Sequence, residues 1–244
     1  MSQASRRYGS PAEGPPSVLV FDVNETLLDI EALEPQFEDI FGDATLLRTW
    51  FDQLVMYSMT LTLSGFYVDF FHLGQAVLNM LSQIHRVDPS ADQQHELILA
   101  MRTMPAHPDA APGLQSLLAA GYRLVTLTNS PHQAGSPSPL DNAGLSQYFE
   151  QQVSVDSSGV YKPSTHLYRR VAANLGVPVS DCMMVAAHAW DIIGAQGAGM
   201  RGALITRPGN AALPAYEIPQ PTVVAADITR LAVTMRSIEW AVDP

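Results

Sequence analysis

The chain has 244 residues, with 13 Lys and Arg against 24 Asp and Glu, which gives a formal net charge of −11 at pH 7. This acidic balance argues against a nucleic-acid-binding protein, and the single cysteine, Cys182, excludes a disulfide scaffold. Apolar residues make up 47% of the sequence, which is enough to bury a core, so a disordered chain is not expected.

The first residues predict a flexible polar tail at 1–16 rather than a targeting signal. No apolar run follows Arg6 and Arg7, as the core of a secretory signal requires. The most membrane-like stretch, between Asp52 and Asp69, is too short and too polar to span a bilayer. Together with the low cysteine content, this leads us to expect a cytoplasmic protein without a membrane partner.

Short apolar runs that end in turn-forming residues predict the strands of a sheet. The runs lie at residues 17–21, 123–128, 152–155, 182–187 and 202–206, with a sixth candidate at 222–225. Helical patterns at 111–120, 165–175 and 191–198 separate the later strands. Strands that alternate with helices and are apolar throughout indicate an α/β fold with a Rossmann-like parallel sheet.

The segment after the first strand breaks this alternation. Residues 31–105 show only helical patterns, and the segment is too long for a simple crossover between strands. We therefore expect a helical cap, 31–105, inserted into a Rossmann-like catalytic core formed by 17–30 and 106–240.

Polar residues at the strand ends carry the candidate chemistry, because an open parallel sheet binds its ligands at the carboxyl ends of its strands. They comprise two carboxylates, the only lysine of the chain and several hydrogen-bond donors. These residues are Asp22 and Thr26 after the first strand, Thr128 and Asn129 at the end of the second, Lys162 in the loop before the helix at 165–175, Tyr168 in that helix, and His188 and Asp191 after the fourth strand.

Four pieces of sequence, in this order, resemble the haloacid dehalogenase superfamily. They read FDVNETLLD at 21–29, LTNS at 127–130, YKPSTHLY at 161–168 and AAHAWDIIGA at 186–195. The last two are most similar to the type II 2-haloacid dehalogenase branch. The resemblance implies a hydrolase that acts on carbon–halide bonds, with a Rossmann-like core, an inserted helical cap and no cofactor.

The residues also favour this branch over the phosphatases of the superfamily. A phosphatase uses a second aspartate, two residues after the nucleophile, as a general acid, and an acidic cluster after the fourth strand to help hold Mg²⁺. Here Asn24 occupies the position of the general acid, and a halide leaves without needing a proton. The acidic cluster after the fourth strand is reduced to one carboxylate, Asp191, so we expect no metal.

The implied mechanism is covalent catalysis, in which Asp22 attacks the carbon that bears the leaving group and water hydrolyses the resulting ester. Lys162 is expected to keep Asp22 ionised, and Asp191 to orient Lys162 and the water. His188 is expected to help activate that water with a pKa near neutrality. The substrate-binding residues expected in the core are Thr26, Thr128, Asn129 and Tyr168.

The cap departs from the family pattern at the position that holds the leaving halide. The family carries an Arg beside a Trp on the first long cap helix, and alignment on Trp50 and Tyr57 puts Phe51 in its place. Arg48 lies on the same helical face and is the candidate replacement. Phe51, Tyr57 and Arg48 are therefore the substrate-binding residues expected from the cap.

These departures keep the nucleophile and leave the leaving group open. The first hypothesis is release of halide, fluoride included, from a small 2-haloalkanoic acid. The second is cleavage of a carbon–nitrogen bond, as in ring opening of a strained cyclic amino acid, which an apolar Phe51 suits. The third is a non-catalytic relative that binds a small acid, with Phe51 and Ala186 as marks of lost activity. A homodimer is a further hypothesis.

Overall fold

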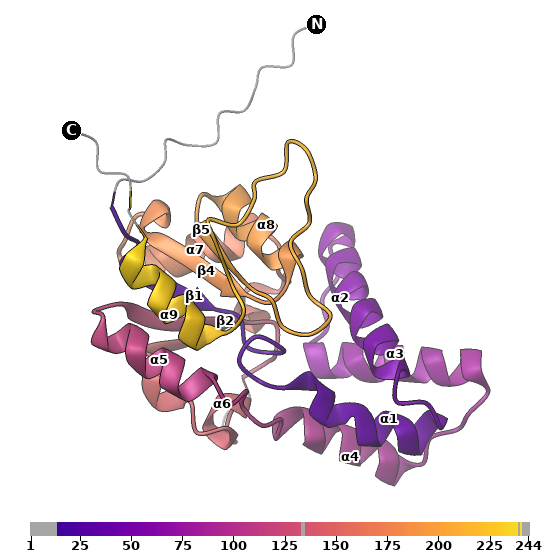
Figure 1. The fold of residues 1–244 in the computed structure, drawn as a ribbon. Helices are drawn as coiled ribbons and strands as arrows, with labels where there is room; N and C mark the ends of the chain where they lie inside the picture. Colours follow the sequence, from indigo (N-terminus) through magenta and orange to yellow (C-terminus); the bar gives the residue numbers. More distant parts are fainter. Residues whose placement is uncertain (1–13, 133–134, 239, 241–244) are drawn as a thin grey trace, which may run out of the picture.

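The computed structural model describes residues 14–132, 135–238 and 240 (Figure 1). It shows a sheet flanked by helices, with a helical unit beside it. The tail predicted at 1–16 falls mostly outside the described residues. Within the described part, no helix combines the length and apolar character needed to cross a membrane.

Six parallel strands form the sheet. They are β1 (Val18–Phe21), β2 (Arg123–Thr128), β3 (Gln151–Ser154), β4 (Cys182–Ala186), β5 (Arg201–Ile205) and β6 (Val223–Ala225). Their order across the sheet is β3-β2-β1-β4-β5-β6, and each neighbouring pair is parallel. Central β1 is buried along its whole length, which is why its sequence is apolar without alternation. The Rossmann-like α/β core is thereby confirmed.

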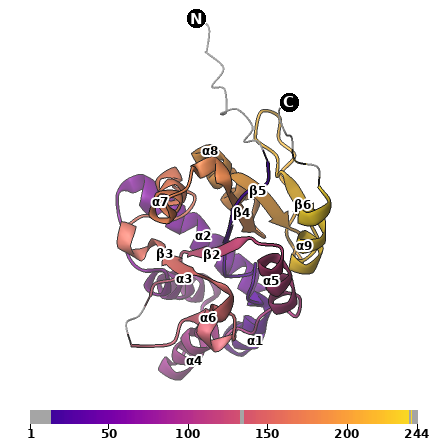
Figure 2. The ribbon, with the colours of Figure 1, turned by 90° about the vertical axis from the view of Figure 1, so that its left-hand side faces the viewer.

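Helices cover both faces of the sheet (Figure 2). On one face α5 (Ala110–Ala119) packs against α9 (Ile228–Ser237), and on the other α7 (Thr165–Leu175) packs against α8 (Ala189–Ala198). The short α6 (Pro139–Asn142) lies between β2 and β3 in the chain. Single 3₁₀ turns occur at Ile30–Leu33, Ser146–Tyr148, Val155–Ser158 and Val179–Asp181.

Most element boundaries lie within one residue of those expected from the sequence, and two differences have a local cause. β3 ends at Ser154 because Val155 begins a 3₁₀ turn, in which the Ser154 hydroxyl accepts a hydrogen bond from the backbone of Asp156. Helix α8 begins at Ala189, two residues earlier than expected, because His188 has an extended backbone and occupies the N-cap position.

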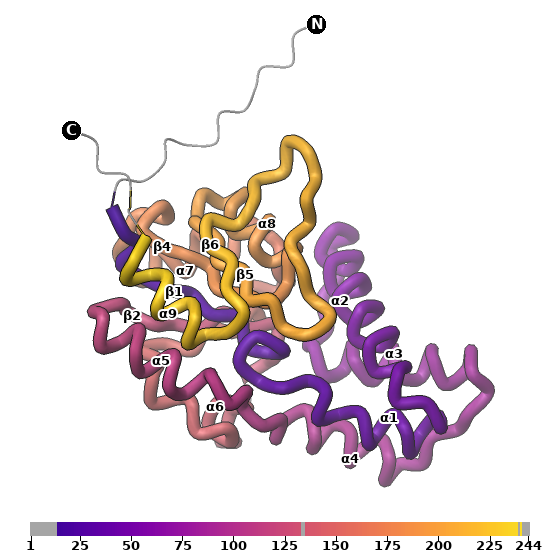
Figure 3. The backbone as a smooth tube through the Cα atoms, viewed as in Figure 1, coloured from indigo at the N-terminus to yellow at the C-terminus, as the bar shows by residue number. Residues whose placement is uncertain are grey.

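Helices form the segment inserted after β1, and Figure 3 shows them beside the sheet. They are α1 (Glu34–Phe41), α2 (Leu46–Ser64), α3 (Phe70–His85) and α4 (Ala91–Arg102). Helices α2 and α3 approach closely at Gly74, whose carbonyl accepts a hydrogen bond from the Trp50 indole at 2.9 Å. A Cβ at position 74 would lie 3.1 Å from that ring. The expected helical cap is thus present.

Candidate functional site

Asp22 occupies the carboxyl end of central β1, and its side chain is only 7% exposed. Its Oδ2 accepts a hydrogen bond from the Thr26 hydroxyl at 2.7 Å. The Thr26 oxygen in turn accepts from the backbone N–H of Ala187, just after β4, at 2.9 Å. The loop after β1 is therefore fixed to the end of the neighbouring strand, and Asp22 is held in one orientation.

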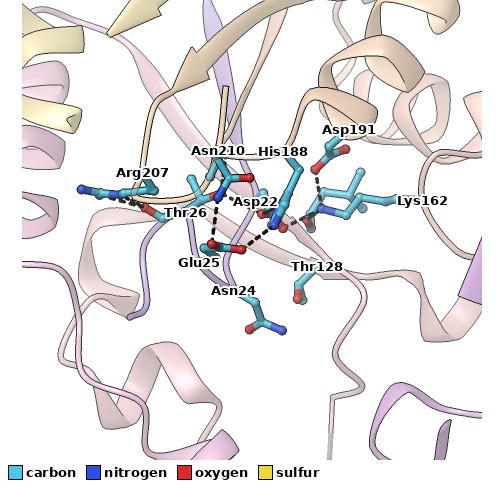
Figure 4. A network of polar contacts seen from close by, with 12 residues as sticks. Asp22, Asn24, Glu25, Thr26, Thr128, Lys162, His188, Asp191, Arg207 and Asn210 are labelled. Carbon is cyan, nitrogen blue, oxygen red and sulfur yellow. Dashed lines mark hydrogen bonds and ion pairs between the residues drawn. The ribbon is translucent and has the colours of Figure 1, made fainter. Parts of the chain in front are cut away.

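Lys162 lies between two buried carboxylates (Figure 4). Its Nζ donates to Oδ1 of Asp22 and to Oδ2 of Asp191, both at 2.7 Å, and to the backbone oxygen of Leu127 at 3.0 Å. The side chain is 1% exposed. An ammonium group has three protons, so all of them are engaged, and the cation is held rigidly against Asp22.

The two carboxylates differ in their affinity for a proton. Burial by itself raises the pKa of Asp22, but Lys162 and His188 outweigh it and hold that pKa well below its usual range. Burial also raises the pKa of Asp191, where the neighbouring charge of Asp22 adds to it and Lys162 does not fully compensate. Asp22 is therefore the stronger acid of the two and is ionised at neutral pH, which is the state a carboxylate nucleophile needs.

Three of the residues expected to bind substrate contact other groups of the site. The Tyr168 hydroxyl donates to Oδ1 of Asp191 at 2.5 Å, and the Asn129 side-chain oxygen accepts from the backbone N–H of Lys162 at 3.2 Å. Thr26 bonds Asp22, as described. These side chains position the charged residues. Thr128 is half-buried, and its hydroxyl accepts from the backbone of Ser130 at 3.1 Å.

His188 lies at the start of α8, beside Asp22. Its Nε2 lies 2.8 Å from Oε2 of Glu25, and its Nδ1 lies 3.4 Å from Oδ2 of Asp22. The ring stacks on Trp190 at 5.2 Å between centroids, and the Phe51 ring lies 5.7 Å away. The imidazole is 8% exposed.

The protonation state of His188 differs from the one expected from the sequence. Burial disfavours the cation, but the carboxylates of Asp22 and Glu25 outweigh it and raise the pKa of His188 to about 9. The ring is therefore an imidazolium at neutral pH, and both nitrogens carry a proton to donate. In this state it cannot act as a base toward water.

Glu25 is a site residue that the sequence analysis missed. Its backbone is in the left-handed region, with φ of 65°, and its carboxylate is buried. Besides His188, it contacts the Arg48 guanidinium and the Asn210 amide, the latter at 2.8 Å. Arg48 also pairs with Glu31 at 3.0 Å. The structure thus places Arg48 against two carboxylates, and we do not propose it as the halide-binding replacement.

Arg207 was missed as well, although it follows a strand. Its guanidinium donates twice to the backbone oxygen of Thr26, at 3.2 and 2.9 Å, and twice to the Asp109 carboxylate, at 2.7 and 2.9 Å. Arg207 and Asn210 both lie in the loop after β5. Extending the search for strand-end residues from the fourth strand to the fifth would have found them.

The cap brings two of its expected residues to this cluster, Arg48 beside Glu25 and Phe51 beside His188. Phe51, on α2, is 6% exposed and faces the His188 ring. Tyr57, farther along α2, donates its hydroxyl to the sulfur of Met80 on α3 at 3.6 Å, a contact within the cap. In the described residues, no group of three or more His, Cys, Asp or Glu side chains is arranged to hold a metal ion.

Gly194 on α8 lets the Lys162 loop and the Asp191 helix approach each other. A Cβ at this position would lie 2.4 Å from the Pro163 Cβ and 2.9 Å from the Tyr168 hydroxyl. We expect Gly194→Ala to lower the free energy of unfolding by about 2–3 kcal/mol, because well-packed interiors resist added atoms. Urea denaturation measures this loss.

Gly197→Ala is the matched control on the same helix. That glycine is exposed, and a Cβ there would meet only a Thr165 methyl group at 3.6 Å. Alanine has a higher helix propensity than glycine, so this variant should gain about 0.5–1 kcal/mol. Equal stability of the two variants would contradict the close-packing explanation for Gly194.

Comparison with known proteins places this arrangement in a family. Residues 16–199 match the model of the haloacid dehalogenase-like hydrolases. (S)-2-haloacid dehalogenase 4A of Burkholderia cepacia is 30% identical over 200 residues, which cover 81% of this chain and 85% of the relative. (S)-2-haloacid dehalogenase 1 of Pseudomonas sp. (strain CBS-3) is 33% identical over 190 residues, or 77% and 83% of the two chains. A crystal structure of a dehalogenase, 27% identical, superposes with a TM-score of 0.81 over 88% of this chain and 95% of that one.

Proposed function

Because the chain belongs to the haloacid dehalogenase-like hydrolase family, we propose that it displaces halide from a small 2-haloalkanoic acid through an ester at Asp22. The observation that carries this proposal is the buried, ionised Asp22 carboxylate held at 2.7 Å by Lys162. The relatives named (S)-2-haloacid dehalogenases support the choice of substrate. We further propose that the enzyme acts in the cytoplasm.

In the proposed first step, an oxygen of Asp22 forms a bond to the substrate carbon while the carbon–halogen bond breaks and halide leaves with the electron pair. Water then adds to the carboxyl carbon of Asp22 and releases a 2-hydroxy acid. Asn24 stands where a phosphatase of this fold would need an acid, and it cannot supply a proton. A departing halide needs no proton, so Asn24 favours carbon–halide cleavage over phosphate-ester cleavage. The single carboxylate after β4, Asp191, favours a reaction without a metal.

Cleavage of a strained carbon–nitrogen ring is a second candidate that one observation favours. The cap presents the apolar Phe51 ring where its family carries a halide-binding cation. The same attack by Asp22 would open the ring. A purely binding relative is less well supported, because an ionised carboxylate held beside a buried lysine serves a nucleophile better than it serves a receptor for anions.

Isotope labelling tests the proposal. With 2-chloropropionate, 2-bromopropionate or fluoroacetate in ¹⁸O water, we expect halide release and, over several turnovers, ¹⁸O in the peptide that contains Asp22. In a single turnover the label should enter Asp22 and not the product, because the first product carries an oxygen of Asp22 itself. Mass spectrometry of the peptide and of the hydroxy acid makes the distinction, and EDTA should leave the rate unchanged.

Two results would exclude the proposed function. Halide released without label in Asp22 would exclude the ester. No halide from any of these acids would exclude a dehalogenase, and turnover of a strained cyclic amino acid in that case would establish the second candidate.

A further inference from the structure

The two oxygens of Asp22 have different partners. Oδ1 receives one donor, Nζ of Lys162. Oδ2 receives the Thr26 hydroxyl at 2.7 Å and faces Nδ1 of His188 at 3.4 Å. Each carboxylate oxygen has two lone pairs, so Oδ1 keeps one free for attack, whereas both lone pairs of Oδ2 face a donor. Oδ1 is therefore the oxygen suited to form the ester, and Oδ2 becomes the ester carbonyl.

One nitrogen of the His188 ring is held by Glu25, and the other points toward Asp22 without a hydrogen bond. Nε2 is bound to Glu25 at 2.8 Å. Nδ1 is buried and lacks a hydrogen-bond partner within normal distance, and its nearest polar neighbour is Oδ2 of Asp22. A buried N–H without an acceptor is energetically costly. A negative charge that forms on Oδ2 of Asp22 only during the reaction would supply the acceptor for Nδ1.

Glu25 is held more firmly than a surface carboxylate. The Arg48 guanidinium and the Asn210 amide bind one of its oxygens, and His188 binds the other. Its left-handed backbone, with φ of 65°, is unfavourable for any residue with a Cβ, and such strain persists where the surrounding structure imposes it and often marks a functional position. A glycine would remove the strain but also the partner of His188.

We propose, on the basis of the proposed function, that Glu25 and His188 act as a pair in the second step, in which His188 and Thr26 stabilise the negative charge that forms on Oδ2 of Asp22. Water adds to the carboxyl carbon, and the electron pair of the carbonyl moves to Oδ2, where the two donors meet it. The bond from the carboxyl carbon to Oδ1 then breaks, and Oδ1 leaves as the hydroxyl oxygen of the product. One proton of the water ends on that hydroxyl and the other passes to solvent.

This assignment gives each residue a defined part. His188 contacts an atom that reacts and is a catalytic residue of the hydrolytic step. Glu25 acts through the imidazolium and is a positioning residue. The first step should proceed without either of them, because Lys162 remains on Oδ1 and is the larger of the two influences that keep Asp22 ionised.

The ester at Asp22 provides the test. His188→Leu, which removes both ring donors, should still release about one halide per active site in a fast first phase, after which the esterified Asp22 peptide accumulates. Its decay, followed by quenched-flow mass spectrometry, should be about 100-fold slower than in the unmodified enzyme, the usual loss for one donor to an oxyanion. His72→Leu is the control, since that imidazole pairs with Asp69 at the surface and is 77% exposed.

The pH dependence of the decay separates this role from that of a base. The charged groups that face the ring are Asp22 and Glu25 from the loop after β1, Arg48 of α2 behind Glu25, and Lys162 beside Trp190. With the pKa of His188 at about 9, the decay rate should fall as pH rises through that value, because the ring loses its proton. A base would give a rate that rises there. Glu25→Gln should shift the fall to lower pH, because the ring loses an anionic neighbour.

Several results would overturn the assignment while leaving the proposed function intact. The first is normal ester decay in His188→Leu while the unmodified enzyme shows both label and halide release. The second is a decay rate that rises with pH, and the third is an unshifted pH profile in Glu25→Gln. Absence of any ester in the unmodified enzyme would instead refute the proposed function. Glu25→Gln keeps the size and hydrogen-bonding ability of the side chain, so it serves as the second variant if His188→Leu does not fold.

Discussion

Replacement of Asp22 by asparagine should abolish halide release, with a loss of about 10⁴-fold or more, as for other enzymes that lose a nucleophile. The amide nitrogen has no free lone pair to attack carbon. The fold should persist, because Lys162 keeps Asp191 as a counter-ion after the change. Thermal unfolding checks the fold, and a halide electrode checks the activity.

The control for this variant is Asp88→Asn, which makes the same chemical change at a carboxylate outside the site. It should leave activity unaltered. Slow deamidation of the introduced asparagine would restore the nucleophile, so the mass of the peptide has to be confirmed at the end of each assay. Full activity in Asp22→Asn with the amide intact would show that Asp22 is not the nucleophile.

Lys162→Met should be inactive and also less stable, by about 3–5 kcal/mol near neutral pH. The reason is that removal of one partner from a buried ion pair leaves uncompensated charge. Here the remaining charges are those of Asp22 and Asp191, both buried. The exposed Arg123–Glu150 pair offers the control, since Arg123→Met should change stability by no more than about 1 kcal/mol.

The pH dependence of stability should change sign in this variant. In the unmodified protein Asp22 has a lowered pKa, so its stabilising contribution is present above the ordinary carboxyl range and is lost as pH falls through the lowered value. Without Lys162, burial and mutual repulsion raise the carboxyl pKa values, and stability is then lost as pH rises through them. The unfolding free energy of the variant should therefore increase from about pH 8 to about pH 5. Parallel urea-denaturation profiles for the two proteins would contradict this.

The gathering of Asp22, Lys162, His188 and Asp191 could be predicted from the sequence, because the carboxyl ends of parallel strands share one edge. The contacts between individual atoms of these side chains could not be predicted from the sequence. Tyr168 was expected at the substrate, yet its hydroxyl faces Asp191, since the two residues lie on the packed helices α7 and α8. That contact depends on helix packing, which strand-end spacing does not determine.

Electrostatic assignments needed the structure most. The helical face of Arg48 was predictable, but its choice of partner depends on Glu25 and Glu31, which lie elsewhere in the chain. Glu25 points into the site because of its left-handed backbone, and an isolated Glu in a loop gives no sign of that conformation. The ionisation of His188 depends on the positions of Asp22 and Glu25, which raise its pKa. The sequence alone therefore suggested a neutral imidazole acting as a base, whereas the structure favours the cation.

The ion pair between Arg48 and Glu25 joins the cap to the core, since Arg48 belongs to α2 and Glu25 to the loop after β1. A movement that lifts α2 from the sheet must separate the two, and Glu25 then loses one of the groups that hold it against His188. Because Asp22 is buried, the proposed function would require such a movement for substrate to enter and product to leave. Closure of the cap would then also hold Glu25 against His188, so that the position of the cap and the hydrolysis of the proposed ester would be coupled through the Arg48–Glu25 salt bridge.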